Sequence, residues 1–210
     1  YIFRLGSIKK MILLNYYWQF EGALSKQICK RIIKLGLSKK IKKSETADAS
    51  KNKLKSLEKR DSSLAWLDNK WIYENIHPAT HAANKNAGWD YQWDWTEKIQ
   101  FGFYKKNQFY GWHTDQGLES TNSNPNAPGK IRKLTSSVQL SDPDTYEGGG
   151  IQLDPRNDDP DLSEKKSFID LSKKQGTIIC FPSHLWHRAM PIIKGTRYSL
   201  TLWHWGYPFR

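Results

Sequence analysis

Two side chains that can bind a metal ion lie close together near the middle of the chain. His113 and Asp115 end the stretch Phe109–Asp115, and residues two apart in an extended strand point to one face. An imidazole beside a carboxylate supplies two of the three ligands of a facial ferrous-iron site, which leaves positions open for oxygen and a cosubstrate. His187 is the candidate for the third ligand, on a strand folded back beside the first.

The His-x-Asp pair alone is weak evidence for a metal site. A chain with 6 histidines and 21 acidic residues has a fair chance of containing one such pair on its surface. The complete set is more specific, because Arg197 follows ten residues after His187 and opens the alternating segment Arg197–Trp203. A guanidinium there can hold a carboxylate with two hydrogen bonds. Lys194 is the competing cation, but it lies in a predicted turn. The remaining alternative is a set of satisfied polar groups at the mouth of a barrel.

The set His113-x-Asp115, His187 and Arg197, together with Tyr146–Gly150, resembles the Fe(II)/2-oxoglutarate-dependent dioxygenases of the prolyl-4-hydroxylase type. The closest likeness is to the small bacterial and phage hydroxylases of that superfamily. The similarity covers about residues 60–206 well, and residues 20–36 more loosely. It implies a mostly β fold with flanking helices, in which a double-stranded β-helix (jelly-roll) core carries iron at one mouth.

The resemblance also implies the cofactors Fe(II), 2-oxoglutarate and O2, and it allows ascorbate as a reductant. Tyr104 matches a tyrosine that helps to hold the cosubstrate, with Tyr110 as the competing choice and core packing as the alternative for both. Gln139 stands where many of these enzymes carry a second tyrosine on the cosubstrate carboxylate. Arg197, Thr201 and Trp203 share one face of the last strand. We therefore expect Thr201 near the cosubstrate, and Trp203 and Tyr110 near the substrate.

The function that the resemblance implies is hydroxylation of an unactivated C–H bond, coupled to oxidative decarboxylation of 2-oxoglutarate. A prolyl residue in a protein or peptide is the first choice of substrate. A free amino acid or another small molecule is the second, and a nucleic-acid demethylase of the same fold is the third. A cupin-like binding module without activity is the non-enzymatic alternative.

The charge of the chain is unevenly distributed. Residues 1–60 contain 16 Lys and Arg but 4 Asp and Glu, a net +12, whereas residues 61–210 contain 17 of each kind. We therefore separate an N-terminal strand, helix and basic segment (1–60) from a catalytic domain (61–210), with residues 10–36 packed on that domain. The lysine-rich residues 38–59 lack a core pattern and are predicted to be a mobile linker or lid. Such a run usually faces solvent; contact with nucleic acid or an acidic protein is the sharper alternative.

Two helices are expected before the β-rich part. The first begins at the N-cap Ser25, buries a stripe from Leu24 to Leu35 and ends at Gly36. The second covers residues 71–87 and should be kinked or divided at Pro78. Its histidines, His77 and His81, are spaced as zinc ligands can be, but no further ligand follows, so we expect them on the helix surface. Residues 10–20 are predicted to form a buried strand.

Strands are predicted over residues 98–104, 109–114, 131–141, 151–153, 167–171, 176–181 and 186–190, followed by the strand that opens at Arg197. Within 131–141, even-numbered residues from Arg132 to Leu140 should share one face and the odd-numbered ones the other. Residues 116–130 and 157–165 are expected to be loops. Cys29 and Cys180 are expected to be buried thiols, which together with the lack of a disulfide framework favours a cytoplasmic location. No apolar segment approaches the ~20 residues of a membrane span, so no membrane association is expected.

Overall fold

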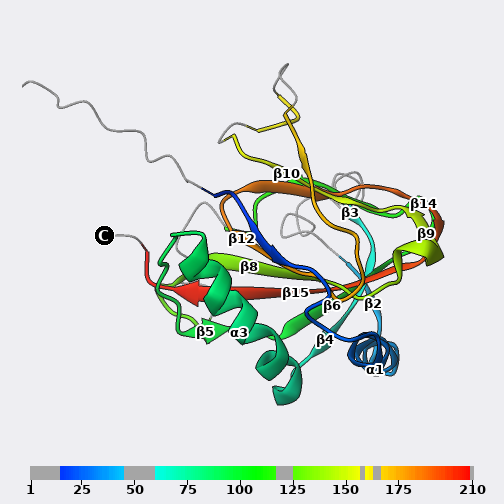
Figure 1. Ribbon diagram of the computed structural model, residues 1–210, viewed down its shortest axis with the longest axis horizontal. Coiled ribbons are helices and arrows are strands. Elements are labelled where there is room, and N and C mark those ends of the chain that lie inside the picture. The colour runs from blue at the N-terminus through cyan, green and yellow to red at the C-terminus, as the bar shows by residue number, and fades with distance from the viewer. Residues whose placement is uncertain (1–14, 45–59, 117–124, 157–158, 163–166, 209–210) are drawn as a thin grey trace, which may run out of the picture.

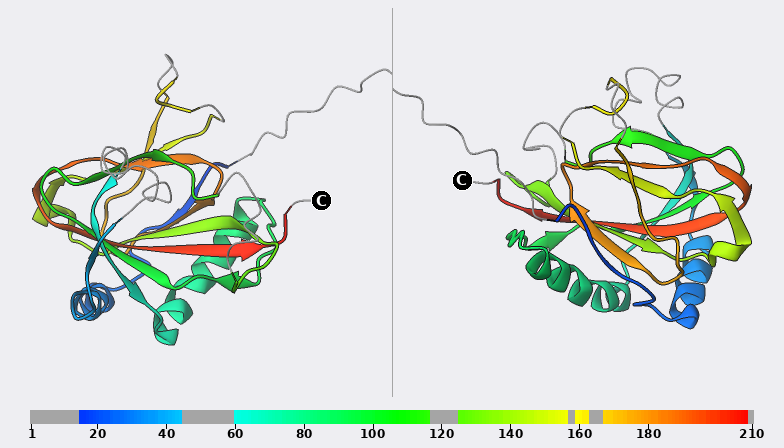
Figure 2. Two further views of the ribbon diagram at one scale, coloured as in Figure 1. Left: turned by 180° about the vertical axis from the view of Figure 1, so that it is seen from behind. Right: turned by 45° about the horizontal axis from the view of Figure 1, so that its top comes forward.

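The computed structural model describes residues 15–44, 60–116, 125–156, 159–162 and 167–208. These residues form two antiparallel β-sheets that face each other, with two helices on the outer side of the larger sheet (Figures 1 and 2). This arrangement is the double-stranded β-helix with flanking helices that the sequence predicts.

The larger sheet has eight strands and the smaller has five. The larger sheet consists, in spatial order, of β1 (Trp18–Phe20), β12 (Ile178–Pro182), β8 (Ile131–Gln139), β15 (Arg197–Gly206), β6 (Ile99–Tyr104), β4 (Ser63–Leu67) and β2 (Lys42–Lys43), with β5 (Trp95–Thr96) also paired to β15. The smaller sheet consists of β11 (Ile169–Asp170), β10 (Ile151–Asp154), β13 (Trp186–Ala189), β7 (Phe109–His113) and β3 (Arg60–Asp61). A separate pair joins β9 (Tyr146–Gly148) to β14 (Ile192–Gly195), and one 3-10 turn covers Pro143–Thr145.

The strand β8 shows how the alternation of the sequence divides the two faces of the larger sheet. Leu134 and Val138 lie in the main hydrophobic core, beneath the helices. Thr135 and Ser137 instead line a cavity between the two sheets. The sheet therefore has an outer face that packs against the helices and an inner face that is free to carry polar side chains.

Helix α1 (Lys26–Leu37) begins as predicted, because the Ser25 hydroxyl accepts a hydrogen bond from the Ile28 amide at 3.3 Å. The prediction that Gly36 ends the helix is wrong, since Gly36 lies inside α1. Its role is close packing: a methyl group at this position would lie 2.5 Å from the ring of Phe101 on β6.

Helix α3 (Lys70–Asn86) runs without a division through Pro78, contrary to one of the two predicted outcomes. Proline removes the hydrogen bond to the carbonyl of Glu74, and both residues are exposed, so water can satisfy that carbonyl. The helix packs against β1 and β12 on the outer face of the larger sheet. No helix in the described part of the chain is long and apolar enough to cross a membrane.

The N-terminal part joins the sheet at both edges. Within the predicted strand 10–20, residues 10–14 lie outside the described residues and Trp18–Phe20 pair with β12. The prediction of a mobile segment from residue 38 onward is wrong for residues 42–43, which pair with β4. Residues 45–59 lie outside the described residues. The prediction that Lys194 lies in a turn is wrong, because Lys194 belongs to β14, which pairs with β9.

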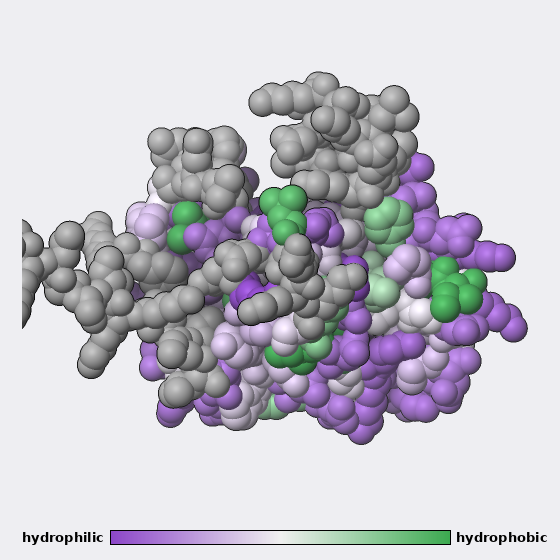
Figure 3. Space-filling model, turned by 90° about the horizontal axis from the view of Figure 1, so that it is seen from above, coloured by the Kyte–Doolittle hydropathy of each residue, from purple (hydrophilic) through white to green (hydrophobic). Residues whose placement is uncertain are grey.

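The described surface on the side of the smaller sheet is mainly hydrophilic, with separate hydrophobic spots (Figure 3). Both cysteines are free and buried, as predicted. The apolar side chains of the fold are thus concentrated between the larger sheet and its helices, and in a smaller cluster between the two sheets.

Candidate metal and cosubstrate site

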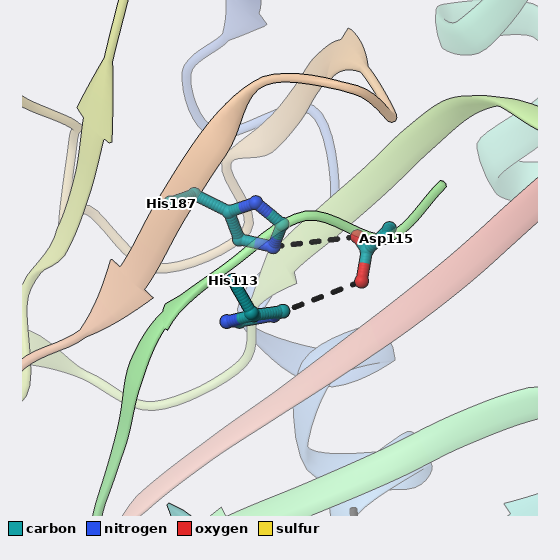
Figure 4. A group of neighbouring side chains, drawn as sticks. All are labelled: His113, Asp115 and His187. Carbon is teal, nitrogen blue, oxygen red and sulfur yellow. Dashed lines mark ion pairs between the residues drawn. The ribbon is translucent and has the colours of Figure 1, made fainter. Parts of the chain in front are cut away.

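Three predicted metal ligands meet between the two sheets. His113 ends β7 and His187 lies on the neighbouring β13, where the two residues are directly paired across the strands. Asp115 follows two residues after His113. One ligand atom from each of the three lies within 4.8 Å of the others (Figure 4). A pair separated by 74 positions in sequence is thereby placed side by side by strand pairing alone.

Both histidines are oriented by hydrogen bonds to backbone carbonyls. Nδ1 of His113 lies 2.8 Å from the Gly111 carbonyl, and Nδ1 of His187 lies 3.0 Å from the Leu185 carbonyl. A carbonyl can only accept, so Nδ1 carries the proton in both rings. The Nε2 lone pair of each ring is then available to a cation, the arrangement found in metal-binding histidines.

The carboxylate of Asp115 is held between the rings. Its oxygens lie 3.7 Å from Nε2 of His113 and 3.3 Å from Nε2 of His187. The hydroxyl of Thr135, on β8, donates to Oδ2 of Asp115 at 2.8 Å. The backbone amide of Asp115 donates to the Ser183 carbonyl at 2.9 Å, which fixes the residue after the strand has ended.

The three groups affect one another's ionisation. Burial and the neighbouring His187 lower the pKa of His113 to about 3, so this ring is neutral. Burial opposes the charge on Asp115, but the attraction of His187 holds the pKa of this carboxyl well below its usual range. Burial lowers the pKa of His187, and Asp115 reverses this effect, so that the pKa is raised. Two imidazoles and an ionised carboxylate suit a divalent transition-metal ion, which would replace the proton attracted to His187.

Arg197 lies at the start of β15 and is 2% exposed. Its Nε and Nη2 donate to Oε1 of Gln139 at 3.3 and 2.9 Å. Burial raises the pKa of the neighbouring Tyr146 hydroxyl, and the charge of Arg197 opposes this effect. Gln139 and Tyr146 are both neutral. A buried guanidinium with neutral partners is suited to receiving an anion.

Gln139 provides the test of whether 2-oxoglutarate fits here. Its Oε1 is used by Arg197, whereas its Nε2 is buried without a hydrogen-bond partner among the described residues. A carboxylate placed beside Arg197 would accept from this amide and from the guanidinium together. The residues therefore fit the distal carboxylate of the cosubstrate, and glutamine can take the part expected of a tyrosine.

The other predicted cosubstrate residues border the same space. Tyr104 and Thr201 line the cavity that also contains His113, Asp115, His187 and Arg197. The guanidinium of Arg197 lies 5.6 Å from the ring centre of Tyr104. The competing cation, Lys194, is exposed on β14 and does not line this cavity.

Trp203 and Tyr110, predicted near the substrate, also line the cavity. The ring of Tyr110 stacks on His113 with 3.5 Å between centroids. Nε1 of Trp203 is buried and lacks a hydrogen-bond partner in the described part of the chain. Both residues thus border the metal side of the cavity, and one of them offers a free donor.

Arg132 was predicted to share a face of the strand with Leu134, and this prediction is wrong. Leu134 pairs with His204 and Arg132 pairs with Trp205, so one extra residue, Lys133, is inserted in β8. This bulge turns Arg132 to the inner face. There it donates to both carboxylate oxygens of Glu97, at 2.7 and 3.0 Å.

No role in the site was predicted for Arg132, Thr135 or Tyr146. The Arg132 guanidinium lies 4.0 Å from the ring centre of Trp203. Thr135 donates to Asp115, and Tyr146 lies close enough to Arg197 for its pKa to be affected by that charge. The alternation of β8 could have placed Thr135 on the inner face, and Tyr146 belongs to a motif already noted, whereas only the bulge reveals Arg132.

The two helix histidines are not part of this site, as expected, although His77 is not simply a surface residue. It is half-buried on the other side of the larger sheet, with its ring centre 5.3 Å from Trp93 and 5.6 Å from His204. His81 is exposed and stacks on Trp93 at 4.5 Å. Among the described residues, the only group with metal-ligand geometry is His113, Asp115 and His187.

Several solved structures have a similar fold. A viral collagen prolyl hydroxylase from Paramecium Bursaria Chlorella virus-1, in complex with 2OG, aligns with a TM-score of 0.63 and 20% identity over 91% of this chain and 97% of that one. A Pseudomonas putida prolyl-4-hydroxylase aligns with a TM-score of 0.59 and 14% identity over 91% and 92% of the two chains. Identities this low establish a shared fold.

Sequence comparison identifies the family. A PKHD-type hydroxylase of Xanthomonas axonopodis pv. citri is 26% identical over 103 residues, which are 49% of this chain and 41% of the relative. One from Xylella fastidiosa (strain M12) is 27% identical over 106 residues, 50% of this chain and 42% of the relative. The chain thus matches less than half of the length of these curated relatives. The sequence profile of the 2OG-Fe(II) oxygenase superfamily matches residues 99–205, just over half of the chain and all the residues of the cavity that bear on the metal and its cosubstrate. The protein belongs to the 2OG-Fe(II) oxygenase superfamily.

Proposed function

We propose that the protein is a hydroxylase that inserts one oxygen atom into a C–H bond of a prolyl residue in a protein or peptide. The observation that carries this proposal is the joining, in one cavity, of the His113–Asp115–His187 cluster and the buried cation Arg197. The class of enzyme follows from the family. The reaction and the substrate are the proposed parts.

His113, Asp115 and His187 would hold Fe(II), and Arg197 with Gln139 would hold the distal carboxylate of 2-oxoglutarate. When bound, these cofactors supply oxidative decarboxylation of 2-oxoglutarate to succinate and carbon dioxide, coupled to hydroxylation by O2. The backbone carbonyls of Gly111 and Leu185 keep both Nε2 atoms directed at the metal position. Thr135 keeps Asp115 from turning away.

The substrate would enter on the side of Tyr110 and Trp203. Tyr110 packs flat on His113 and shields that ring from water, which keeps it neutral. The free Nε1 of Trp203 can donate to a backbone carbonyl of a bound peptide. Glu97 neutralises Arg132 beside Trp203, so the aromatic rings on this side of the cavity can pack against an uncharged ring such as proline.

The similar structures support a polypeptide substrate. One of them is a Trichoplax adhaerens prolyl hydroxylase in complex with a peptide fragment of the hypoxia inducible factor oxygen degradation domain, which aligns with a TM-score of 0.60 and 17% identity over 91% of this chain and 84% of that one. The curated sequence relatives are named as hydroxylases as well.

Mass spectrometry of proline-containing peptides tests the proposal. The protein is incubated with Fe(II), 2-oxoglutarate and a peptide library, and each product is examined for the mass of one added oxygen atom. The gain should localise to proline and require all components. A library in which proline is replaced by alanine is the matched control. Equal oxidation of the alanine library, or oxidation of free amino acids alone, would overturn the prolyl assignment.

A further inference from the structure

A second surface of the protein is built almost entirely from lysine. Between residues 22 and 44 the chain has eight basic residues and no acidic one. All eight are exposed. They are Lys26, Lys30, Arg31, Lys34, Lys39, Lys40, Lys42 and Lys43, and we call this set the basic surface. It comprises helix α1, the turn after it and the edge strand β2, which lie together at one end of the larger sheet (Figure 1).

Little of this charge is neutralised within the described structure. Lys26 lies 3.7 Å from Asp142, and Lys43 lies 3.6 Å from Asp61. The other six cations form no ion pair with a described residue. At the spacing of residues 26, 30 and 34, three lysines repel one another along one stripe of a helix. Such an arrangement destabilises the free protein slightly and favours a bound polyanion.

A series of contacts joins the basic surface to the candidate site. Lys43 pairs with Asp61 on β3, and the preceding residue, Arg60, pairs across the strands with Tyr110. The guanidinium of Arg60 lies 4.4 Å from the ring centre of Tyr110, which stacks on His113. These contacts connect the basic surface to the metal side of the cavity.

The basic surface also carries apolar groups. Leu37 and Ile41 are 44% and 41% exposed and lie among the lysines. A phosphate backbone gains nothing from aliphatic side chains, whereas a polypeptide can bury its own against them. Non-specific nucleic-acid surfaces add aromatic rings for stacking on bases. Trp71, beside α1, is already covered by Arg31 at 4.2 Å.

We propose that the basic surface docks an acidic segment of a polypeptide, and that this segment flanks the residue delivered to the cavity. The first part is independent of the reaction. The second part rests on the proposed function.

Direct binding tests the first part. A labelled peptide of Glu, Leu and Ala, and its analogue with Gln for Glu, are titrated with the whole protein by fluorescence anisotropy. The acidic peptide should bind at low salt, and screening should weaken binding as salt is raised. The Gln analogue should bind at least about tenfold more weakly, since exposed ion pairs each contribute a modest amount that adds over several pairs.

Two variants and a control locate the surface. Combined Lys30→Gln, Lys34→Gln, Lys39→Gln and Lys42→Gln should weaken acidic-peptide binding by about tenfold or more. Combined Lys85→Gln, Lys105→Gln, Lys106→Gln and Lys194→Gln removes the same charge from exposed positions elsewhere and should leave binding within about twofold. Leu37→Ser with Ile41→Ser should weaken the peptide and spare any binding of a single-stranded oligonucleotide.

Two results would overturn the docking proposal. One is equal loss of peptide binding in the four-lysine variant of the basic surface and in the control variant, which would indicate a general effect of net charge. The other is tighter binding of an oligonucleotide, or of vesicles containing phosphatidylserine, with the same dependence on the four lysines.

The second part is tested with a peptide in which a proline precedes the acidic segment. The four-lysine variant of the basic surface should have a KM for this peptide about tenfold higher and an unchanged kcat. Binding of the acidic peptide without hydroxylation of any proline would disprove the prolyl function and preserve the docking surface. Hydroxylation of neutral and acidic peptides with equal KM would preserve the function and disprove the link between surface and substrate.

Discussion

The two faces of the larger sheet both bury polar side chains, but they do so in different ways. On the outer face, His204 is fully buried, with Nδ1 3.0 Å from the Thr96 hydroxyl and Nε2 2.9 Å from the Ser136 hydroxyl. Ser136 also lies 2.9 Å from the hydroxyl of Thr80 on α3. On the inner face, by contrast, Gln139 Nε2 and Trp203 Nε1 are buried without partners in the described structure.

The polar groups of the outer face therefore stabilise the fold, whereas those of the inner face are available to bind a ligand. A buried polar atom without a partner costs about 1–3 kcal/mol of stability. The outer face avoids this cost by linking sheet and helix through a closed network. The inner face leaves two donors unpaired, and a bound carboxylate or peptide that accepts hydrogen bonds from them would remove this cost. The same two strands, β8 and β15, carry both arrangements.

The largest effect is expected from removing a metal ligand on the inner side. His187→Ala should abolish binding of Fe(II), or of Mn(II) as a redox-stable probe, and abolish turnover with it. Calorimetric titration with Mn(II) measures the first effect. His81→Ala, which changes an exposed histidine, is the control and should bind the metal as before. Retention of metal by His187→Ala would disprove the assigned ligand set.

Removing the inner-face cation comes next. Arg197→Ala should leave metal binding intact and weaken 2-oxoglutarate by about 2–5 kcal/mol, because the cosubstrate carboxylate would be buried without its charged partner. Titration of 2-oxoglutarate into the Mn(II)-loaded protein measures this loss. Lys194→Ala is the matched control. If Lys194→Ala has the larger effect, the cosubstrate is held at a different place.

Two adjacent serines provide the sharpest comparison of the faces. Ser136→Ala should lower the free energy of unfolding by about 1–3 kcal/mol, since it removes the partner of His204 and of Thr80. Ser137→Ala, on the inner face, should change it by less than about 0.5 kcal/mol. Urea unfolding of both variants gives the two values. Equal losses would show that the two faces do not differ in this way.

The smallest effect concerns pH. Burial, together with the nearby His77 and His81, lowers the pKa of His204 well below its usual value. The unfolded chain, with an ordinary histidine pKa of about 6.5, then binds more protons than the folded one. Stability should therefore be complete above pH 6.5 and decrease as the pH falls below it, by at most about 1.4 kcal/mol per pH unit for this one group. His204→Gln should flatten the decrease, and an unchanged slope would assign it to other groups.

Much of this site could be predicted from sequence, because its central residues have types suited to a specific chemistry and lie in strands with a regular alternation. His113, Asp115, His187 and Arg197 were identified by residue type and spacing, and the structure places all four in one cavity. Alternation in β8 correctly separated Thr135 and Ser137 from Leu134 and Val138.

The errors have a common physical origin, since each depends on the place of the residue in the whole fold. Arg132 changes face because of a bulge that its own sequence does not mark. Gly36 resembles a helix end, but its lack of a side chain serves the ring of Phe101, 65 positions away. Pro78 is tolerated because the affected turn of α3 faces solvent. Local patterns describe a chain by itself, whereas the setting of these three residues in the fold decides what each of them does.

The pairing of His113 with His187 has a consequence for how the protein forms. The two residues become neighbours only when β7 and β13 have come together, which closes a loop of more than 70 residues. The unfolded chain therefore has no assembled metal site, and a cation that binds there stabilises the native state by mass action. During synthesis, the site cannot exist until the segment that carries His187 has left the ribosome. Iron would thus bind late in folding, and it would stabilise a sheet whose strands are already paired.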